Sequence, residues 1–394
     1  MVNESDLKKE ELYDKGIYDY KNNNFEEALK LLNEAIVCDG KFYRAKIAKI
    51  YCLYKMGRLN EVHSICDEIY SSDCLDEEVW CKLGDFYLNV GRMFENALIC
   101  FNKAIEINQL YADAWDMRGS VLSVMGNMEE ALNSHKRAAE LDSNNSSIYD
   151  NIAYCYASLS MFDNALEAYY KAIEIDPEDI NALSNIASIL NNIGKSEEAL
   201  DYINRALEIK EDYNLLYYKA VVLFTLEKFD ESLETINQSL ELYSFNHNGW
   251  KFKGQLLIEM ENYQEAILAY DKVLTYDPSD VQGWFYMITS LVNLGMLEEA
   301  LEGCNEVLKI DSAVFFIFEK ANILYELDRL DESLEICNAQ LNSDKFDSDF
   351  YLLKAKIYNK KDDKNRAIEY VEKAIEYNSI MEDAISFREE LLNG

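Results

Sequence analysis

The side chains that could do chemistry in this sequence are scattered along the chain. Its three histidines, His63, His135 and His247, lie far from one another, and its nine cysteines include no C-x-x-C pair. A zinc site needs Cys or His ligands at short, convergent spacing. Carboxylates are so numerous that a pair of them carries no information, and no glycine-rich phosphate loop is present. We therefore expect no catalytic residue, no metal site and no cofactor.

The charge balance points to the kind of partner. The 394 residues include 38 basic and 73 acidic side chains, a formal net charge of −35. Such a field repels nucleic acids and anionic membranes and favours basic partners. Acidic pairs such as Glu129-Glu130 and Glu298-Glu299 also suit the first turns of helices, where they complement the backbone dipole, so solubility is an alternative explanation of part of the charge.

A helix pair repeats along the chain, and these repeated pairs would have to position the residues of any site. The second helix of each predicted pair carries a small residue that allows close packing on the first. Spacings between these residues are 34, except for one of 35 and two of 33, which predict one-residue changes in turns. The series is Ala28, Val62, Ala97, Ala131, Ala165, Ala199, Ser232, Ala266, Ala300, Ser333 and Ala367. Eleven positions in this register predict eleven helix pairs.

One stretch shows the repeat pattern without exception. Residues 80–87 read W-x2-L-G-x2-Y, and Ala97 with Phe101 continues the pattern as A-x3-F. In this pattern the sequence resembles the tetratricopeptide repeat (TPR) family. The resemblance implies an all-α fold, a right-handed α-α superhelix of antiparallel helix pairs. Each pair cannot bury its apolar face alone, so neighbouring pairs stack into a continuous core.

Several residues are expected to hold this architecture together. Gly57, Gly91, Gly126, Gly194 and Gly295 stand where a left-handed residue ends the first helix. His135 occupies the aromatic position of its repeat, so a packed core histidine is expected there. We predict a single solenoid domain over residues 1–394, with eleven repeats over about 9–379. Residues 380–392 form the expected C-terminal capping helix, with Ile380, Met381, Ala384, Ile385, Leu391 and Leu392 packed against the last repeat.

The resemblance also implies where a partner binds, because the first helix of each TPR lines the concave groove. In repeats five and six the groove positions are polar: Asn151, Tyr154, Asn185, Ser188 and Asn192. Asn151 and Asn185 lie 34 residues apart, an arrangement similar to the TPR arm of O-GlcNAc transferases, in which such amides hold a peptide backbone. The alternative is that these are merely polar residues on a solvated face.

Repeats seven to ten differ, because their groove positions are mainly aromatic. The predicted peptide-binding residues there are Tyr217, Tyr218, Phe252, Gln255, Tyr286, Phe318 and Asn322. Exposed aromatic side chains are common anchors for a partner. The paired Lys, Arg and Asn residues of TPR carboxylate clamps are not clustered here, which disfavours an acidic C-terminus as the ligand.

The sequence therefore predicts a protein–protein interaction scaffold that binds a peptide or protein segment, preferably a basic one. The alternative is a structural protein that self-assembles into homo-oligomers through its repeat surfaces. No apolar run is long enough to span a bilayer, and the N-terminal residues lack the apolar core of a signal peptide. With nine scattered cysteines, these features lead us to expect a cytoplasmic protein that is not an enzyme and binds neither nucleic acid nor membranes.

Overall fold

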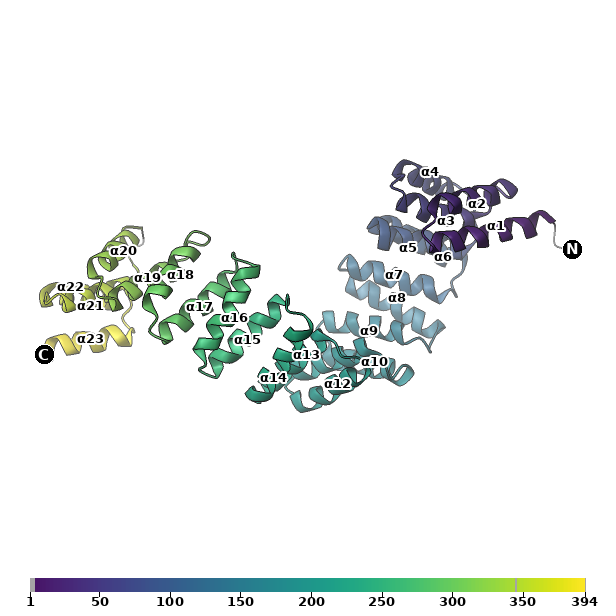
Figure 1. Ribbon diagram of the computed structural model, residues 1–394. Helices are drawn as coiled ribbons and strands as arrows, with labels where there is room; N and C mark the ends of the chain where they lie inside the picture. Colours follow the sequence, from purple (N-terminus) through teal and green to yellow (C-terminus); the bar gives the residue numbers. More distant parts are fainter. Residues whose placement is uncertain (1–3, 344–345, 394) are drawn as a thin grey trace. The chain divides into compact units, whose positions relative to one another are not determined.

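The computed structural model describes residues 4–343 and 346–393, and all regular elements in these ranges are helices. The chain divides into two compact units, residues 1–190 and 191–394, and the division falls within helix α11. The all-α solenoid expected from the sequence is confirmed (Figure 1).

The first unit contains five helix pairs and most of α11. Its first helices are α1 (Glu4–Lys21), α3 (Tyr43–Lys55), α5 (Glu77–Asp85) continued by the π-helix η1 (Phe86–Gly91), α7 (Ala112–Val124), α9 (Ser146–Ser158) and α11 (Ile180–Asn192). Its second helices are α2 (Phe25–Cys38), α4 (Leu59–Tyr70), α6 (Phe94–Ile107), α8 (Met128–Leu141) and α10 (Phe162–Ile175). Each second helix packs against the first helix of its own pair, and α2, α6 and α8 also pack against the first helix of the next pair.

The second unit continues the same alternation. Its first helices are α13 (Tyr213–Thr225), α15 (His247–Glu259), α17 (Val281–Asn293), α19 (Val314–Glu326) and α21 (Ser348–Lys360). Its second helices are α12 (Ser196–Ile209), α14 (Phe229–Leu242), α16 (Tyr263–Tyr276), α18 (Leu297–Val307), α20 (Leu330–Ser343) and α22 (Lys364–Tyr377), and α23 (Glu382–Asn393) packs against α22.

The small residue of each second helix is buried as the 34-residue register requires. Ten of the eleven are fully buried and Val62 is 3% exposed. Where serine replaces alanine, its hydroxyl finds a partner on the first helix. Ser232 Oγ and Ser333 Oγ donate to the carbonyls of Ala220 and Ala321 at 2.7 Å. A buried hydroxyl without such a partner would be costly, so serine serves here as an isostere that also ties the two helices together.

The turn between the two helices of a pair is the most regular feature of the chain. A residue in the left-handed region stands five places before the small residue in every repeat. These residues are Asn23, Gly57, Arg92, Gly126, Ser160, Gly194, Glu227, Glu261, Gly295, Asp328 and Asp362. Gly91 was expected among them, and that expectation is wrong, since Gly91 ends η1 and Arg92 takes the left-handed position. The turn geometry is thus conserved across repeats even where the residue is not glycine.

The expectation that the 35-residue spacing changes a turn is also wrong. The turn before α6 keeps its geometry, and the added residue lies in the first helix, which widens into η1 at Phe86. A π-helical turn accommodates one extra residue without breaking the helix. One of the two 33-residue spacings does shorten a turn, since only residues 210–212 separate α12 from α13.

The C-terminal helix differs in detail from its prediction. Helix α23 begins at Glu382, and Ala384 and Leu391 are buried against the preceding repeat. Ile380 and Leu392 were expected to pack, but they are 83% and 61% exposed. Ile380 precedes the helix, so it does not share the helical period of the buried residues. The division into eleven repeats and a cap within one domain stays a prediction.

Candidate functional site

The predicted groove residues of the first unit lie on α9 and α11, and most of them are open to solvent. Tyr154 is 53% exposed, and Asn185 and Ser188 are also exposed. All three lie on first helices, where the apolar residues between them face the core. These side chains have free hydrogen-bonding capacity on one helical face, as a peptide-binding surface requires.

Asn151 differs from Asn185, although both hold the same position in their repeats. Its Nδ2 donates to Asp116 Oδ1 at 3.2 Å, and His135 Nδ1 lies 2.6 Å from the same oxygen. Because a carboxylate only accepts, the His135 ring nitrogen carries the hydrogen. His135 is 1% exposed, which confirms it as a core histidine. The asparagine ladder is therefore unequal, with Asn151 engaged inside the protein.

The His135 ring explains the glycine beside it. A Cβ built on Gly119 would approach the ring to 2.6 Å, and one on Gly84 would approach Phe101 to 2.7 Å. Such distances are far inside van der Waals contact, so a side chain at Gly84 or Gly119 would clash with the ring that it faces. The hydrogen bond from His135 then fixes Asp116 and, through it, Asn151.

The carboxyl group of Asp150, also in the first unit, has no counter-charge. Asp150 lies on α9, and its Oδ1 is buried without a hydrogen-bond partner among the described residues. Asp179 precedes α11 and accepts from the backbone N–H groups of Asn181 and Ala182 at 3.0 and 3.1 Å. Burial and the neighbouring carboxyl of Asp179 raise the pKa of Asp150 to about 8. Asp150 is therefore largely protonated at neutral pH.

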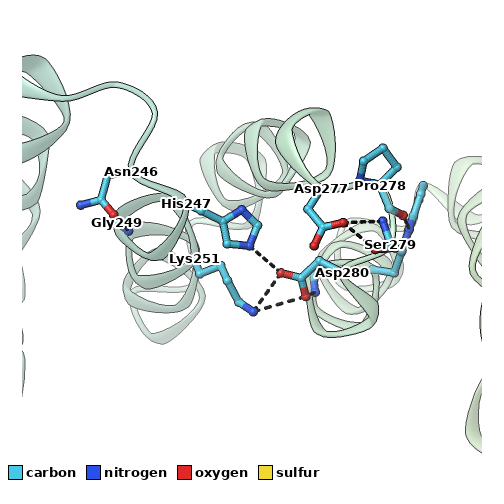
Figure 2. A network of polar contacts seen from close by, with 10 residues as sticks. Asn246, His247, Gly249, Lys251, Asp277, Pro278, Ser279 and Asp280 are labelled. Carbon is cyan, nitrogen blue, oxygen red and sulfur yellow. Dashed lines mark hydrogen bonds and ion pairs between the residues drawn. The ribbon is translucent and has the colours of Figure 1, made fainter. Parts of the chain in front are cut away.

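The equivalent place in the second unit is a closed polar network (Figure 2). Asp280 precedes α17 and accepts from the backbone N–H of Gly283 at 2.9 Å. Lys251 Nζ, on α15, lies 2.9 Å from Asp280 Oδ2, and His247 Nε2 lies 2.8 Å from the same oxygen. Burial alone would raise the pKa of Asp280, but the hydrogen bonds from Lys251, Gly283 and His247 outweigh it and leave that pKa below its usual range.

The predicted aromatic residues of the second unit pack largely on one another. Tyr217 and Phe224 each meet Phe252 edge-on, with ring centroids 5.7 and 5.8 Å apart. Phe252 is only 8% exposed and belongs to the core, so its ring positions its neighbours. Tyr218 is 47% exposed and stands at the surface of this cluster.

Farther along the second unit, the predicted residues are half-buried. Gln255 Nε2 lies 3.3 Å from Tyr286 Oη, and the Tyr286 ring stacks on Tyr270 at 5.5 Å. Phe318 packs edge-on against Phe350 at 5.1 Å. Asn322 is half-buried, and Asn192, at the end of α11, is exposed. The structure thus separates the predicted set into exposed residues and residues that support the repeat stack.

Sequence reasoning did not find the roles of Asp116 and Asp179. Each lies near a groove residue only because consecutive first helices are neighbours in space. One signal was available: Asp179 and Asp280 are both the last residue before a first helix, a position that favours a side chain accepting from the first turn. To find which side chains face Asp179 and Asp280, one must also know how the residues of the preceding first helix are aligned with them.

The buried thiols of this chain are poor nucleophiles. Burial raises the pKa of Cys81, Cys304 and Cys337 to about 12. Cys66 follows His63 by three residues on α4, yet burial raises the pKa of Cys66 as well. A thiol that is not ionised neither attacks nor binds metal well. Among the described residues, no cluster of three or more His, Cys, Asp or Glu side chains could hold a metal ion.

Together these observations define an all-α repeat protein whose exposed first-helix faces carry amides, hydroxyls and aromatic rings. Family comparison gives the class a name. Models described as tetratricopeptide repeat match residues 77–109, 112–145, 150–179, 168–201, 253–314 and 348–380. The chain belongs to the tetratricopeptide repeat family. A further family model, anaphase-promoting complex, cyclosome, subunit 3, matches residues 194–273.

Solved structures with a similar fold include three that illustrate the range. Yeast Tom70 is 15% identical, with a TM-score of 0.41 and coverage of 98% of this chain and 96% of that chain. PilF of Pseudomonas aeruginosa is 18% identical, with a TM-score of 0.46 and coverage of 51% and 92%. YrrB, described as a TPR protein with an unusual peptide-binding site, is 22% identical, with a TM-score of 0.40 and coverage of 46% and 94%. No curated protein sequence matches the chain.

Within residues 4–343 and 346–393, no helix is both long enough and apolar enough to cross a bilayer.

Proposed function

We propose that this protein is a non-catalytic scaffold that binds a segment of another polypeptide on the concave faces of its first helices. Membership of the TPR family supports the role of interaction scaffold. The proposed contact residues are Tyr154, Asn185 and Ser188 in the first unit, and Asn192, Tyr217, Tyr218, Gln255, Tyr286, Phe318 and Asn322 in the second. Asn151 and Phe252 were also predicted to contact the partner, but Asn151 is hydrogen-bonded to Asp116 and Phe252 is buried, so they support this surface from within.

The main observation behind this proposal is that large side chains are exposed in the groove. Packing of the repeats on one another does not require this exposure. Tyr154 and Tyr218 are 53% and 47% exposed, although each lies on a first helix beside buried core residues. Tyrosine offers a large apolar contact area together with a hydroxyl, at little cost in conformational entropy, and it is enriched at binding hot spots. Asn185 and Ser188 add amide and hydroxyl groups that suit a peptide backbone.

The structure also favours a basic partner segment. The chain carries a formal net charge of −35, so a basic ligand is attracted at long range. At close range, Asp150 and Asp179 face each other without a cation, whereas Asp280 is neutralised by Lys251. Burial is the main cause of the raised pKa of Asp150, and the neighbouring Asp179 adds to it; a lysine or arginine of the partner would relieve this second contribution. Binding of such a segment should therefore lower that pKa and release a proton near neutral pH.

The experiment is a peptide array in which sequences are matched in length and apolar content and vary in net charge. We expect basic peptides to bind the full-length chain, and the double variant Tyr154→Ala/Asn185→Ala and the single variant Tyr218→Ala to weaken them at least tenfold. Leu268→Ala is the matched control, because Leu268 is 64% exposed but lies on a second helix. Equal binding by wild type and all variants would show that the groove assignment is wrong.

A homo-oligomeric role is the second candidate, and an exposed aromatic cluster in the second unit supports it. Phe245 is 65% exposed, and its ring lies 5.5 Å from that of Tyr276 and 6.3 Å from that of Tyr243. Large exposed apolar surfaces often mark interfaces. Sedimentation velocity across a concentration series tests this candidate. A mass that stays monomeric for wild type and for Phe245→Ser removes it.

A cytoplasmic location belongs to the same proposal. All nine cysteines are free thiols, and eight of them are buried. Free thiols persist in a reducing compartment, where disulfides are rare.

A further inference from the structure

The 35-residue spacing between Val62 and Ala97 creates a π-helix, a feature that no other repeat shares within residues 4–343 and 346–393. The turn residue Arg92 keeps its usual five-residue distance from Ala97, so the extra residue lies between Gly84 and Arg92. There the first helix changes from α5 to the π-helix η1, residues 86–91. A single π-helical turn of this kind often marks a functional site, because it redirects side chains that a regular helix would bury.

A small apolar cavity lies against this π-helix. Its volume is about 180 Å³, and its walls include Val62 and Cys66 of α4, Phe86, Tyr87 and Val90 of η1, and Met93 of the following turn. His63 of α4, an exposed residue, is the polar side chain in its lining. An apolar protein cavity of roughly 150 Å³ is large enough to bind benzene, whereas sites for drug-sized molecules span about 300–1,000 Å³. The cavity therefore fits one six-membered ring and little more.

The walls of the cavity are held in place by ring contacts. Phe86 is 4% exposed and meets Tyr51 and Tyr54 edge-on, with centroids 5.4 and 5.7 Å away. Tyr87 is 5% exposed and packs against Phe86 at 5.8 Å and Tyr70 at 6.0 Å. A pre-formed wall does not have to be ordered on binding, which lowers the entropic cost of a ligand.

The surroundings of the cavity are apolar and locally basic. Leu59, Met93 and Tyr54, which also line it, are 49%, 41% and 36% exposed. Lys55 and Arg92 adjoin lining residues in the sequence, since Lys55 follows Tyr54 and Arg92 lies between Gly91 and Met93. Both are exposed and have no ion pair among the described residues, unlike Arg58, which bonds Glu61 at 2.6 Å.

From this combination we propose that the cavity binds the phenyl ring of a phenylalanine in a partner polypeptide, next to an acidic residue of the same segment. The ring fills the cavity, the flanking apolar atoms of the segment cover Leu59 and Met93, and the carboxylate pairs with Arg92 or Lys55. The cavity lies in repeats two and three, whereas the proposed groove residues begin at Asn151. The site therefore goes beyond the proposed function and does not depend on it.

The test uses the full-length chain and the peptide Gly-Gly-Phe-Asp-Gly-Gly, with 4-fluorophenylalanine as the aromatic residue and 19F NMR as the readout. Replacing the aromatic residue by alanine in an unlabelled competitor should weaken competition at least tenfold. Replacing Asp by Lys should weaken it about threefold to tenfold. These two comparisons need no protein variant, so they are independent of any folding defect.

Protein variants then locate the site. Gly91→Phe adds a ring where the nearest atoms to a Cβ are those of the Met93 side chain and the Phe86 carbonyl oxygen, at 3.7–3.8 Å, and Val90→Trp fills the cavity from its rim. We expect either variant to weaken binding at least tenfold. Arg92→Glu should weaken only the Asp-containing peptide, and it keeps the left-handed turn because Glu227 and Glu261 occupy the same position elsewhere.

Three results would overturn the proposal. They are equal affinity of wild type and both filled variants, equal competition by phenylalanine and alanine peptides, and binding of free toluene without binding of any peptide. Tyr154→Ala should leave this peptide unaffected, which separates failure of this site from failure of the groove.

Discussion

Asp150 on α9 and Lys251 on α15 hold the same place in their repeats, three residues before Ala153 and Gly254. Each faces the aspartate that precedes the next first helix, Asp179 in one unit and Asp280 in the other. Lys251 completes an ion pair, whereas Asp150 presents a second carboxyl. The repeat fold thus accepts either an ion pair or two carboxyls at this junction between consecutive first helices. We propose that the junction with two carboxyls is where the chain binds a partner.

The groove residues near Asp150 are also more exposed and less engaged than those near Lys251. Near Asp150, Tyr154 and Asn185 are exposed and have no partner that would need to be displaced. Near Lys251, Phe252 is buried and Gln255 is bonded to Tyr286. We infer that the junction in the first unit is available to a ligand, while the one in the second unit contributes mainly to stability.

The largest loss of stability is expected when the network around Asp280 loses its carboxylate. Asp280→Ala removes the acceptor of the Gly283 N–H and leaves Lys251, a half-buried cation, without its carboxylate. Loss of a helix cap together with one partner of a largely buried pair costs about 3 kcal/mol. The free energy of urea unfolding, followed by tryptophan fluorescence, measures this effect, and Trp250 and Trp284 lie in the helices concerned. Asp277→Ala, an exposed aspartate in the same turn, is the control, and an equal effect of both variants would contradict this assignment.

A smaller loss is expected when the closed junction is made to resemble the open one. Lys251→Asp places two carboxyls opposite each other, as in the first unit, and should lower the unfolding free energy at pH 8 by about 2 kcal/mol. The loss should shrink as pH falls towards 4, because one carboxyl then takes up a proton. Lys251→Met keeps the apolar stem and should cost less at pH 8. If the loss from Lys251→Asp does not depend on pH, the two carboxyls are not close.

The smallest effect has the opposite sign. The folded-state pKa of Asp150, about 8, is raised above the value of about 4 that we expect in the unfolded chain, so the stability associated with its proton is complete below pH 4 and is lost as pH rises to 8. Asp150→Asn removes this penalty. We expect the variant to be more stable than wild type by about 1–2 kcal/mol at pH 8, after allowance for solvent screening, and equal to it at pH 4. Glu167→Gln, on the exposed face of α10, makes the same charge change and should show no such trend. A gain for Asp150→Asn that is the same at pH 4 and pH 8 would sink this explanation.

Much of the fold could be predicted because the repeat makes local sequence signals add up. Buried small residues in a 34-residue register define the helix pairs, and His135 could be placed in the core from the position it shares with Phe101. The π-helix could not be placed, because a 35-residue spacing is compatible with an insertion either in a turn or in a helix. What decided it was the geometry of the turn, which keeps Arg92 at a fixed distance from Ala97.

The site was less predictable than the fold. Position along the first helix identified Asn151 and Phe252 as groove residues, but their partners come from other helices. Asp116 and His135 engage Asn151, and Tyr217 and Phe224 cover Phe252. Exposure therefore depends on the neighbouring repeats, which a single helical period does not encode.

The central claim, that first-helix faces bind a basic segment, is tested most directly by site-specific photo-crosslinking. p-Benzoylphenylalanine would replace Tyr154 or Tyr218 on first helices, and Leu268 or Ile99 on second helices, in the full-length chain with the strongest basic peptide from the array. Positions 268 and 99 are matched for exposure, since Leu268 and Ile99 are 64% and 48% exposed. The account predicts crosslinks from positions 154 and 218, lost when unlabelled peptide competes, and none from 268 or 99. Crosslinks of equal yield from all four positions, or only from the second helices, would contradict it.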